Sequence, residues 1–363
     1  ATQVFNEVVA FPADGSGPPH LVAGGDGSVA PADFVASPTV APDGKTIAWV
    51  SWDHPNMPWD STTLWVAPFD PMTGSIAGLP RAVVDRVRAD GAQASLVHPA
   101  WGPDGGLYVL TDASGWWNLA RVGDDGSVSP VVALDADLCG PFWGFAPAPY
   151  AFLPDGSILI TPRRGGNAQL ATVRAHGGDP DRVISEGWVG GSPSVFGARV
   201  LAIVGRATLA PQVVVIDLGA SARTVEVLRE ADASIPSNDI STGEAITFPT
   251  AGDAVAHATY YAPRNGSHVS APGLVPPLMV LSHGGPTGAT SAAYSPRVQF
   301  WTTRGFAVVD VDYRGSTGYG RAYREALRDA WGVADVDDCV AAAQYLAEQG
   351  MADRSRLAIM GGS

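Results

Sequence analysis

A turn signal followed by a short strand recurs through the first two-thirds of the chain. The three signals are Pro42-Asp43-Gly44, Pro103-Asp104-Gly105 and Pro154-Asp155-Gly156. In each, Pro presets φ, Asp can hydrogen-bond its own backbone, and Gly accepts a positive φ. Strand-like apolar runs follow at residues 46–50, 107–110 and 157–160. A spacing of about 50 to 60 residues suits the four-stranded blades of a β-propeller.

A second strand is predicted after two of these turns, at residues 63–67 and 118–122, and Gly123-Asp124-Asp125-Gly126 predicts another hairpin turn. We therefore expect residues 1–235 to form an all-β propeller, with a β-sandwich as the alternative. Only about four or five blades fit this length at that spacing. We expect the propeller to be partial in this chain, with further blades before Ala1.

The pattern changes after residues 236–250, which we interpret as a linker. Continuous apolar strands are predicted at residues 278–282, 306–312 and 356–360, with one helix from about 323 to 349. Strands of this kind around a helix are typical of a parallel sheet covered on both faces. Residues 236–363 are thus expected to form an α/β domain. The apolar stripe of the helix is predicted to comprise Val336, Cys339, Val340, Ala343 and Leu346.

The last predicted strand runs into Gly361-Gly362-Ser363, which matches the start of a Gly-x-Ser-x-Gly nucleophile elbow. In such an elbow a sharp strand-to-helix turn exposes the serine oxygen, and small neighbours permit the bend. Gly-Gly-Ser is also common in plain loops, which is the alternative. We predict Ser363 as the nucleophile.

His283-Gly284-Gly285-Pro286 directly follows the strand at residues 278–282. A loop after an early strand donates a backbone N–H to the oxyanion hole in α/β-hydrolases, and glycines let the backbone approach a substrate carbonyl. The alternative is a glycine turn with a capping histidine. The order of these motifs predicts an α/β-hydrolase domain.

A third glycine-rich segment, residues 313–320, follows the strand that ends at Asp312. Arg314 is expected to hold this segment by pairing with Asp335 or Asp337. We favour a structural role for Arg314 and Tyr319 over contact with a substrate.

These segments, together with Asp335-Val336-Asp337-Asp338 before an Ala-rich helix, resemble the prolyl oligopeptidase family of serine peptidases. The similarity is greatest to the branch of acylaminoacyl peptidases, dipeptidyl or aminoacyl peptidases and puromycin hydrolase. It is specific over residues 250–363 and looser over the propeller half. It implies that Ser363 is acylated and that the N–H groups around Gly284 and Gly285 supply one oxyanion donor.

The same resemblance places the second oxyanion donor, the catalytic Asp and the catalytic His after Ser363. We therefore expect this chain to hold only the N-terminal part of the hydrolase domain. His283 belongs to the oxyanion loop and is not expected to be the base. The 363 residues alone are expected to be inactive and poorly stable.

Three candidate substrate contacts are Asp137, Trp143 and His283. The resemblance implies that Asp137 matches the place where aminopeptidase-like relatives often carry a Glu, one methylene longer, that binds the free amino group of the substrate. The alternative is an exposed loop between blades. Trp143, with Phe142, is expected either to line an apolar subsite or to pack in a blade core. Trp116 and Trp117 are expected to pack within a blade.

The composition excludes several classes of protein. A net charge of −14 argues against nucleic-acid binding. Two cysteines, Cys139 and Cys339, cannot form a disulfide framework or a zinc site, and we expect buried free thiols in a reducing, cytoplasmic compartment. No metal or other cofactor is implied. No apolar run approaches the length of a membrane span, and the N-terminus carries no signal-like segment.

We expect a serine peptidase that hydrolyses short peptides or aminoacyl amides, with the propeller excluding large folded proteins. An esterase or amidase on a small molecule, and a non-catalytic propeller binding protein, are the alternatives. The sequence does not reveal the oligomeric state, but the resemblance implies a possible homo-oligomer, because the family often assembles into dimers or larger forms.

Overall fold

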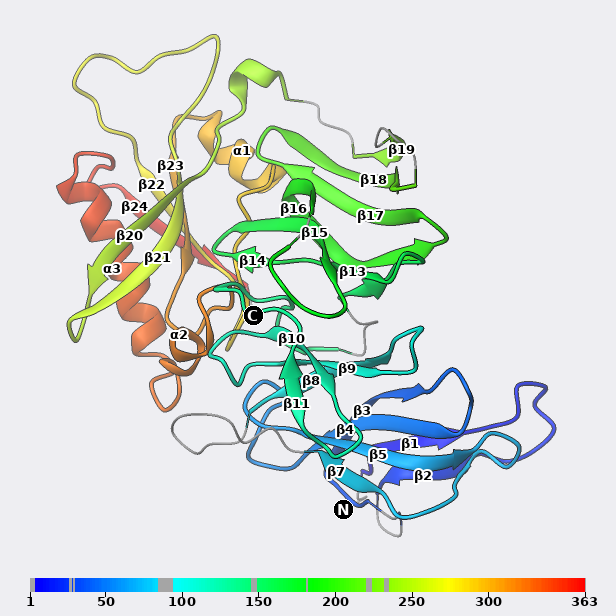
Figure 1. Ribbon diagram of the computed structural model, residues 1–363. Helices are drawn as coiled ribbons and strands as arrows, with labels where there is room; N and C mark the ends of the chain where they lie inside the picture. The colour runs from blue at the N-terminus through cyan, green and yellow to red at the C-terminus, as the bar shows by residue number, and fades with distance from the viewer. Residues whose placement is uncertain are drawn as a thin grey trace. The chain divides into compact units, whose positions relative to one another are not determined.

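The computed structural model describes residues 4–25, 28, 30–83, 94–144, 149–180, 182–219, 224–231 and 235–362 (Figure 1). The chain divides into two compact units. The first comprises Ala1–Leu134, Pro141–Ile160 and Thr172–Asp181, and the second comprises Asp135–Gly140, Thr161–Ala171 and Arg182–Ser363.

The first unit is built from short antiparallel strands. They are β1 (Glu7–Ala10), β2 (His20–Gly24), β3 (Phe34–Val40), β4 (Thr46–Trp52), β5 (Thr63–Asp70), β6 (Ser75–Ile76), β7 (Arg81–Val83), β8 (Leu96–Trp101), β9 (Leu107–Thr111), β10 (Asn118–Val122), β11 (Val128–Pro130), β12 (Ala151–Phe152) and β13 (Ser157–Ile160). One sheet has the order β3-β4-β5-β6 with β7 beside β5, and another has the order β11-β10-β9-β8. Sheets of consecutive short strands are typical of propeller blades. The strands predicted from the turn signals are confirmed as β4, β5, β9, β10 and β13.

The turns form as their sequences predict. Gly44, Gly105 and Gly156 all have positive φ, at 74°, 76° and 80°. Each Asp accepts a hydrogen bond from the backbone N–H two residues on, as from Lys45 to Asp43 at 2.9 Å. Local chemistry therefore fixes where each of these strands starts.

Aromatic side chains fill the interior of this unit. Trp49 is fully buried and stacks on Trp65 with ring centroids 6.2 Å apart. Trp117 is also fully buried, which confirms its predicted packing role. Phe142 is buried as well and packs edge-on against the ring of His98, 5.0 Å away. This packing takes His98 out of water.

The second unit contains a run of antiparallel strands and a mixed sheet with its helices. The antiparallel strands are β14 (Arg163–Arg164), β15 (Asn167–Arg174, of which residues 167–171 belong to this unit), β16 (Arg182–Phe196), β17 (Arg199–Arg206), β18 (Leu209–Asp217) and β19 (Thr224–Glu230). β16, β17, β18 and β19 pair in sequence order. The remaining elements are η1 (Ser237–Asp239), β20 (Glu244–Thr250), β21 (Ala254–Tyr261), β22 (Leu278–Ser282), α1 (Pro296–Thr302), β23 (Ala307–Asp312), α2 (Arg321–Glu325), α3 (Ala334–Glu348) and β24 (Leu357–Gly361).

The mixed sheet has the order β20-β21-β23-β22-β24. β22 runs parallel to both β23 and β24, so the three strands predicted for a parallel sheet are confirmed. The hairpin of β20 and β21 was not predicted, and the linker expected at residues 236–250 is wrong over its second half. Phe248 is the one buried side chain of β20, and Ile246 packs beside it against the same core.

Helices cover both faces of this sheet, as the alternation of side chains along the strands requires (Figure 1). Val280 and Val309 belong to the cluster that includes buried residues of α3. Their neighbours Leu281 and Val308 belong to a second cluster with Val298 of α1. The core of the α/β part is therefore split into two layers by the sheet.

The single helix expected from about 323 to 349 is wrong, because the structure has α2 and α3 instead. Asp329 and Gly332 adopt positive φ, at 59° and 76°, and interrupt the helical path. The expected stripe is partly confirmed: Cys339, Ala343 and Leu346 are buried, whereas Val336 and Val340 are about half exposed. Asp338 is fully buried, in contrast to these two valines. It lies one helical turn from the buried Ala334 and Ala342, on the inner face of α3.

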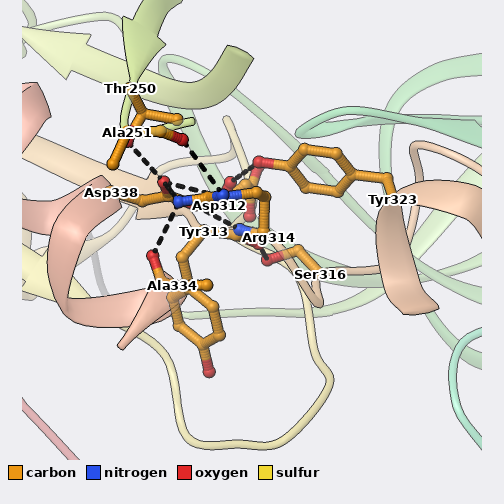
Figure 2. Close-up of polar contacts among 9 residues, drawn as sticks. All are labelled: Thr250, Ala251, Asp312, Tyr313, Arg314, Ser316, Tyr323, Ala334 and Asp338. Atoms are coloured by element: carbon orange, nitrogen blue, oxygen red, sulfur yellow. Dashed lines mark hydrogen bonds and ion pairs between the residues drawn. The ribbon is translucent and has the colours of Figure 1, made fainter. Parts of the chain in front are cut away.

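Arg314 pairs with this buried Asp338 and not with Asp335 or Asp337 (Figure 2). The guanidinium Nη2 lies 2.8 Å from Asp338 Oδ1, and the backbone N–H of Arg314 donates to Oδ2 at 2.7 Å. The hydroxyl of Thr250 also donates to Oδ1, at 2.7 Å. Asp338 therefore joins α3, β20 and the segment after β23. Its place on the inner face of the helix explains why it, and not its partly buried neighbours Asp335 and Asp337, is the partner.

The proposed boundary at residue 235 does not coincide with the division into compact units. The sequence pattern changes between the end of β19 at Glu230 and the start of β20 at Glu244. Compactness instead groups β16 to β19 with the mixed sheet. The all-β segment 1–235 and the α/β segment 236–363 remain our proposal for the domains.

We predict that replacing Arg314 destabilises the full-length protein strongly. Arg314→Leu leaves the Asp338 carboxylate buried without its cation, which should lower the free energy of unfolding by about 3 kcal/mol. The matched control is Arg356→Leu, whose partner Asp353 and own side chain are both partly exposed. It should cost less than about 1 kcal/mol in urea denaturation. Equal losses in the two variants would contradict the assignment of Asp338 as a structural anchor.

A second prediction concerns acid stability. Burial lowers the pKa of His98 to about 4, whereas an exposed histidine titrates near 6.5. Below about pH 6.5 the unfolded chain binds a proton that the folded chain does not, so stability falls with falling pH by up to about 1.4 kcal/mol per unit. His98→Asn, which tolerates the positive φ at this position, should weaken this dependence between pH 7 and pH 4.5.

The control is His268→Asn, because His268 is exposed. Thermal unfolding of the three proteins at several pH values measures the effect. Parallel pH profiles for wild type and His98→Asn would show that His98 does not stay neutral in the folded state.

Candidate functional site

The candidate site lies at the carboxyl ends of β22 and β24. The two strands are parallel and in register, with Ser282 opposite Gly361. His283, Gly284 and Gly285 leave β22 at the same edge at which Gly362 leaves β24. Ser363, the predicted nucleophile, lies outside the described residues. The structure thus brings together the two motifs that flank the predicted chemistry, which are about 75 residues apart in sequence.

One cavity of about 610 Å³ is lined by both motifs. His283, Gly285 and Pro286 contribute from the loop after β22, and Gly362 contributes from the end of β24. Trp331, Val336, Val340 and Ile359 give it an apolar wall. A site with a few polar groups on an apolar surface is typical of small-molecule and peptide pockets.

A larger depression of about 950 Å³ lies in the first unit, between the turns of two sheets. Its walls include Asp104 and Arg121, which already form an exposed ion pair at 3.0 Å. Neither the motif at 283–286 nor the one that ends at Gly362 lines this depression. We therefore assign the candidate site to the smaller cavity, which both motifs line.

Both ring nitrogens of His283 are engaged. Nδ1 lies 2.9 Å from the carbonyl oxygen of Gly284, and Nε2 lies 2.7 Å from the hydroxyl of Ser316. The ring also stacks on Tyr313 with centroids 4.3 Å apart. A histidine held in this way fixes its loop, and its exclusion as the base stays a prediction.

Tyr313 also holds the loop that follows β22. Its hydroxyl donates to the carbonyl oxygen of His283 at 3.2 Å, and burial raises the pKa of Tyr313 to about 12. A Cβ on Gly285 would lie only 3.0 Å from this hydroxyl. A side chain on the second glycine of the motif would therefore crowd Tyr313 in its present position.

Asp312, the last residue of β23, connects the two loops of the site. Its fully buried carboxylate accepts hydrogen bonds from the backbone N–H and hydroxyl of Thr290, at 2.7 and 3.0 Å. It also accepts one from the hydroxyl of Tyr319, at 2.7 Å. Burial raises the pKa of Asp312, and these donors oppose the shift. Figure 2 shows Asp312 beside Tyr313, Ser316 and the Arg314–Asp338 pair.

Asp137 is fully buried, so the expectation of an exposed loop is wrong. Its Oδ2 accepts a hydrogen bond from the backbone N–H of Gly318 at 2.8 Å. Its backbone forms an isolated antiparallel bridge with Arg163. Sequence reasoning singled out this residue, but the structure places it against the 313–320 segment and away from solvent.

Trp143 belongs to the first unit, where it is 53% exposed and packs against Trp59. The blade-core interpretation therefore holds for Phe142 and is wrong for Trp143. Cys139 and Cys339 are both free and buried, as predicted, and burial raises the pKa of the Cys339 thiol to about 12.

Three residues of the site were missed from the sequence: Asp312, Tyr313 and Asp338 in their supporting roles. A signal exists for Asp312, because a carboxylate at the end of a buried strand must find donors nearby. No group of three or more His, Cys, Asp or Glu side chains within the described ranges could hold a metal ion. Nor does any helix in the described part of the chain have the length and apolar character to cross a membrane.

Comparisons with known proteins agree with this geometry. The profile of the prolyl oligopeptidase family matches residues 292–363. A puromycin-hydrolyzing peptidase from Mycobacterium tuberculosis has 37% sequence identity and a TM-score of 0.87, with 98% of this chain and 54% of that chain covered. A puromycin hydrolase has 34% identity and a TM-score of 0.84, with 91% and 49% covered.

Among curated proteins, dipeptidyl aminopeptidase BIII of Pseudoxanthomonas mexicana is 40% identical over 87 residues, which is 24% of this chain and 13% of that protein. The chain thus spans about half the length of the solved structures it matches and less of this curated relative. The similar structures combine a propeller with an α/β-hydrolase domain, and the blade-like sheets and mixed sheet described here follow that architecture. Residues 292–363 thus match the prolyl oligopeptidase family, and the chain as a whole is similar to puromycin-hydrolyzing peptidases and, in part, to a dipeptidyl peptidase of that kind.

Proposed function

We propose that the full-length protein hydrolyses short peptides or aminoacyl amides through an acyl-enzyme on Ser363. The observation that carries this proposal is the shared cavity, which is lined by His283, Gly285 and Gly362. Because Gly362 directly precedes Ser363, the serine hydroxyl would emerge beside the glycine loop. The names of the similar proteins, which are peptidases and hydrolases of puromycin, support the choice of an amide substrate.

In the proposed reaction, Ser363 Oγ attacks the carbonyl carbon of the scissile amide and its proton passes to a histidine base. The carbonyl oxygen gains negative charge, which the backbone N–H groups around Gly284 and Gly285 stabilise together with the N–H after Ser363. The C–N bond then breaks, and the histidine returns the proton to the leaving amine. In the second half of the reaction, the histidine takes a proton from water, which attacks the acyl carbon. The bond to Ser363 Oγ then breaks, and the histidine returns the proton to the serine oxygen.

The family resemblance places the base and its orienting Asp after Ser363 in the full-length protein. His283 is not the base in this proposal, and its contacts with Gly284 and Ser316 support a role in holding the loop. The loop geometry instead supports a purely electrostatic contribution from residues 283–285. No cofactor takes part in the proposed reaction.

The proposal also covers the kind and size of the substrate and the cellular compartment of the protein. The apolar wall formed by Trp331, Val336 and Val340 suits a hydrophobic acyl group. Trp143, a residue that is about half exposed, is proposed as an apolar subsite of the propeller. We also propose a cytoplasmic protein whose propeller admits short peptides only.

We predict that the full-length protein hydrolyses chromogenic aminoacyl amides and that Ser363→Ala lowers kcat by about four orders of magnitude or more, since the nucleophile is lost. Two matched substrate sets, one with a free α-amine and one N-acetylated, should be assayed side by side. Preference for free amines indicates an aminopeptidase, and preference for acetylated substrates indicates an acylaminoacyl peptidase.

The control variant is Ser355→Ala, because Ser355 is an exposed serine just before β24. It should retain wild-type activity. Hydrolysis of esters alone would indicate an esterase on the same fold. If Ser363→Ala and wild type were equally inactive on both sets, the propeller would be better explained as a binding protein.

A further inference from the structure

We propose that Asp137 is a positioning residue, whose buried carboxylate fixes Gly318 and thereby holds the 283–290 loop in its catalytic geometry. This inference rests on the proposed function, in which that loop stabilises the oxyanion. It gives Asp137 a role different from binding the amino group of the substrate.

Both the backbone N–H and the backbone carbonyl oxygen of Gly318 form hydrogen bonds with residues far away in sequence. Its N–H donates to Asp137 Oδ2 at 2.8 Å, and its carbonyl oxygen accepts a hydrogen bond from the N–H of Gly165 at 3.0 Å. Its φ is +87°, and a Cβ at this position would meet the backbone of Gly165 at 3.3 Å. The chain at Gly318 is therefore fixed in one place by main-chain and carboxylate contacts.

Short links connect Gly318 to the loop after β22. The preceding residue, Thr317, donates to the carbonyl oxygen of Gly288 through its N–H at 2.7 Å and through its hydroxyl at 3.0 Å. Ser316, two residues before Gly318, lies 2.7 Å from Nε2 of His283. A displacement of Gly318 is thus transmitted to both ends of the segment 283–288.

The Asp137 segment is also anchored to its own neighbours. The N–H of Asp137 donates to the carbonyl oxygen of Arg163 at 2.9 Å, and the N–H of Arg163 donates back at 2.8 Å. Ala292 donates to the carbonyl oxygen of Gly166 at 2.9 Å. The backbone that carries the Asp137 side chain is therefore itself held in place, as a positioning residue requires.

Burial argues against direct contact with a substrate. Asp137 has no solvent exposure, and a carboxylate that binds an ammonium group of an incoming ligand must be reachable by it. Loss of the carboxylate would leave the Gly318 N–H buried without its acceptor, which disfavours the present loop position. A shift of the oxyanion donors by about 1 Å can lower the rate by about 10²-fold.

The kinetic test compares Asp137→Ala and Asp137→Asn in the full-length protein. Asp137→Ala should lower kcat by tenfold to about 10²-fold with KM within about twofold, equally for free-amine and N-acetylated amides. Asp137→Asn keeps an oxygen acceptor for the Gly318 N–H and should retain kcat within about threefold. A rise of KM confined to free-amine substrates, most of all in Asp137→Asn, would overturn the proposal in favour of ammonium binding.

The matched control is Asp112→Ala. Asp112 is another fully buried carboxylate that accepts a backbone N–H, that of Ser95, at 2.8 Å. It lies in the first unit and should lower stability without lowering kcat per folded molecule. Equal losses of kcat in Asp112→Ala and Asp137→Ala would show a general folding defect and overturn the positioning role.

A measurement independent of catalysis keeps the inference separate from the proposed function. Amide hydrogen exchange of peptides covering residues 283–290 and 313–320 should be faster in Asp137→Ala than in wild type or Asp112→Ala. Unchanged exchange in both peptides would overturn the proposal. If wild type hydrolyses none of the amides while exchange responds as expected, the proposed function fails and the structural link stands.

Discussion

The parallel pairing of β22 with β23 and β24 is the constraint on which the site depends. Parallel strands all end at one edge, so residues that follow them meet there without being close in sequence. His283, Tyr313 and Gly362 each follow one of these three strands. Any sequence change that preserves the two faces of the sheet preserves this meeting point. The chemistry can then vary in the loops while the strands stay the same.

Three buried carboxylates organise the loops at that edge. Asp312 ties the loop after β22 to Tyr319, Asp338 ties the segment after β23 to α3, and Asp137 holds Gly318. A buried carboxylate is costly unless donors surround it, so each one permits only the backbone arrangement that supplies them. Burial of these carboxylates therefore restricts the loop backbones to conformations that supply the hydrogen-bond donors. This explains how glycine-rich loops, which are flexible by composition, come to have one conformation.

Local signals in the sequence were sufficient for the Pro-Asp-Gly turns and the strands next to them, but not for the hairpin of β20 and β21 or for the side-chain pairings. The Pro-Asp-Gly turns and the apolar strands of the parallel sheet were predicted because their determinants lie within a few residues. The partner of Arg314 was predicted incorrectly, because the choice among Asp335, Asp337 and Asp338 depends on which side of α3 faces the sheet. The break between α2 and α3 was missed because Asp329 adopts a positive φ that its residue type only permits. The position of Asp137 depends on a contact across 181 residues, which no local pattern contains.

The contact between Gly318 and Gly165 is made through main-chain atoms alone. Such a contact does not depend on the identity of the neighbouring side chains, provided that the two glycines stay. A substitution of the exposed Asn167, two residues after Gly165, would therefore leave this contact in place. The surface next to the candidate site can thus change by substitution without changing the main-chain contact that holds the 313–320 segment.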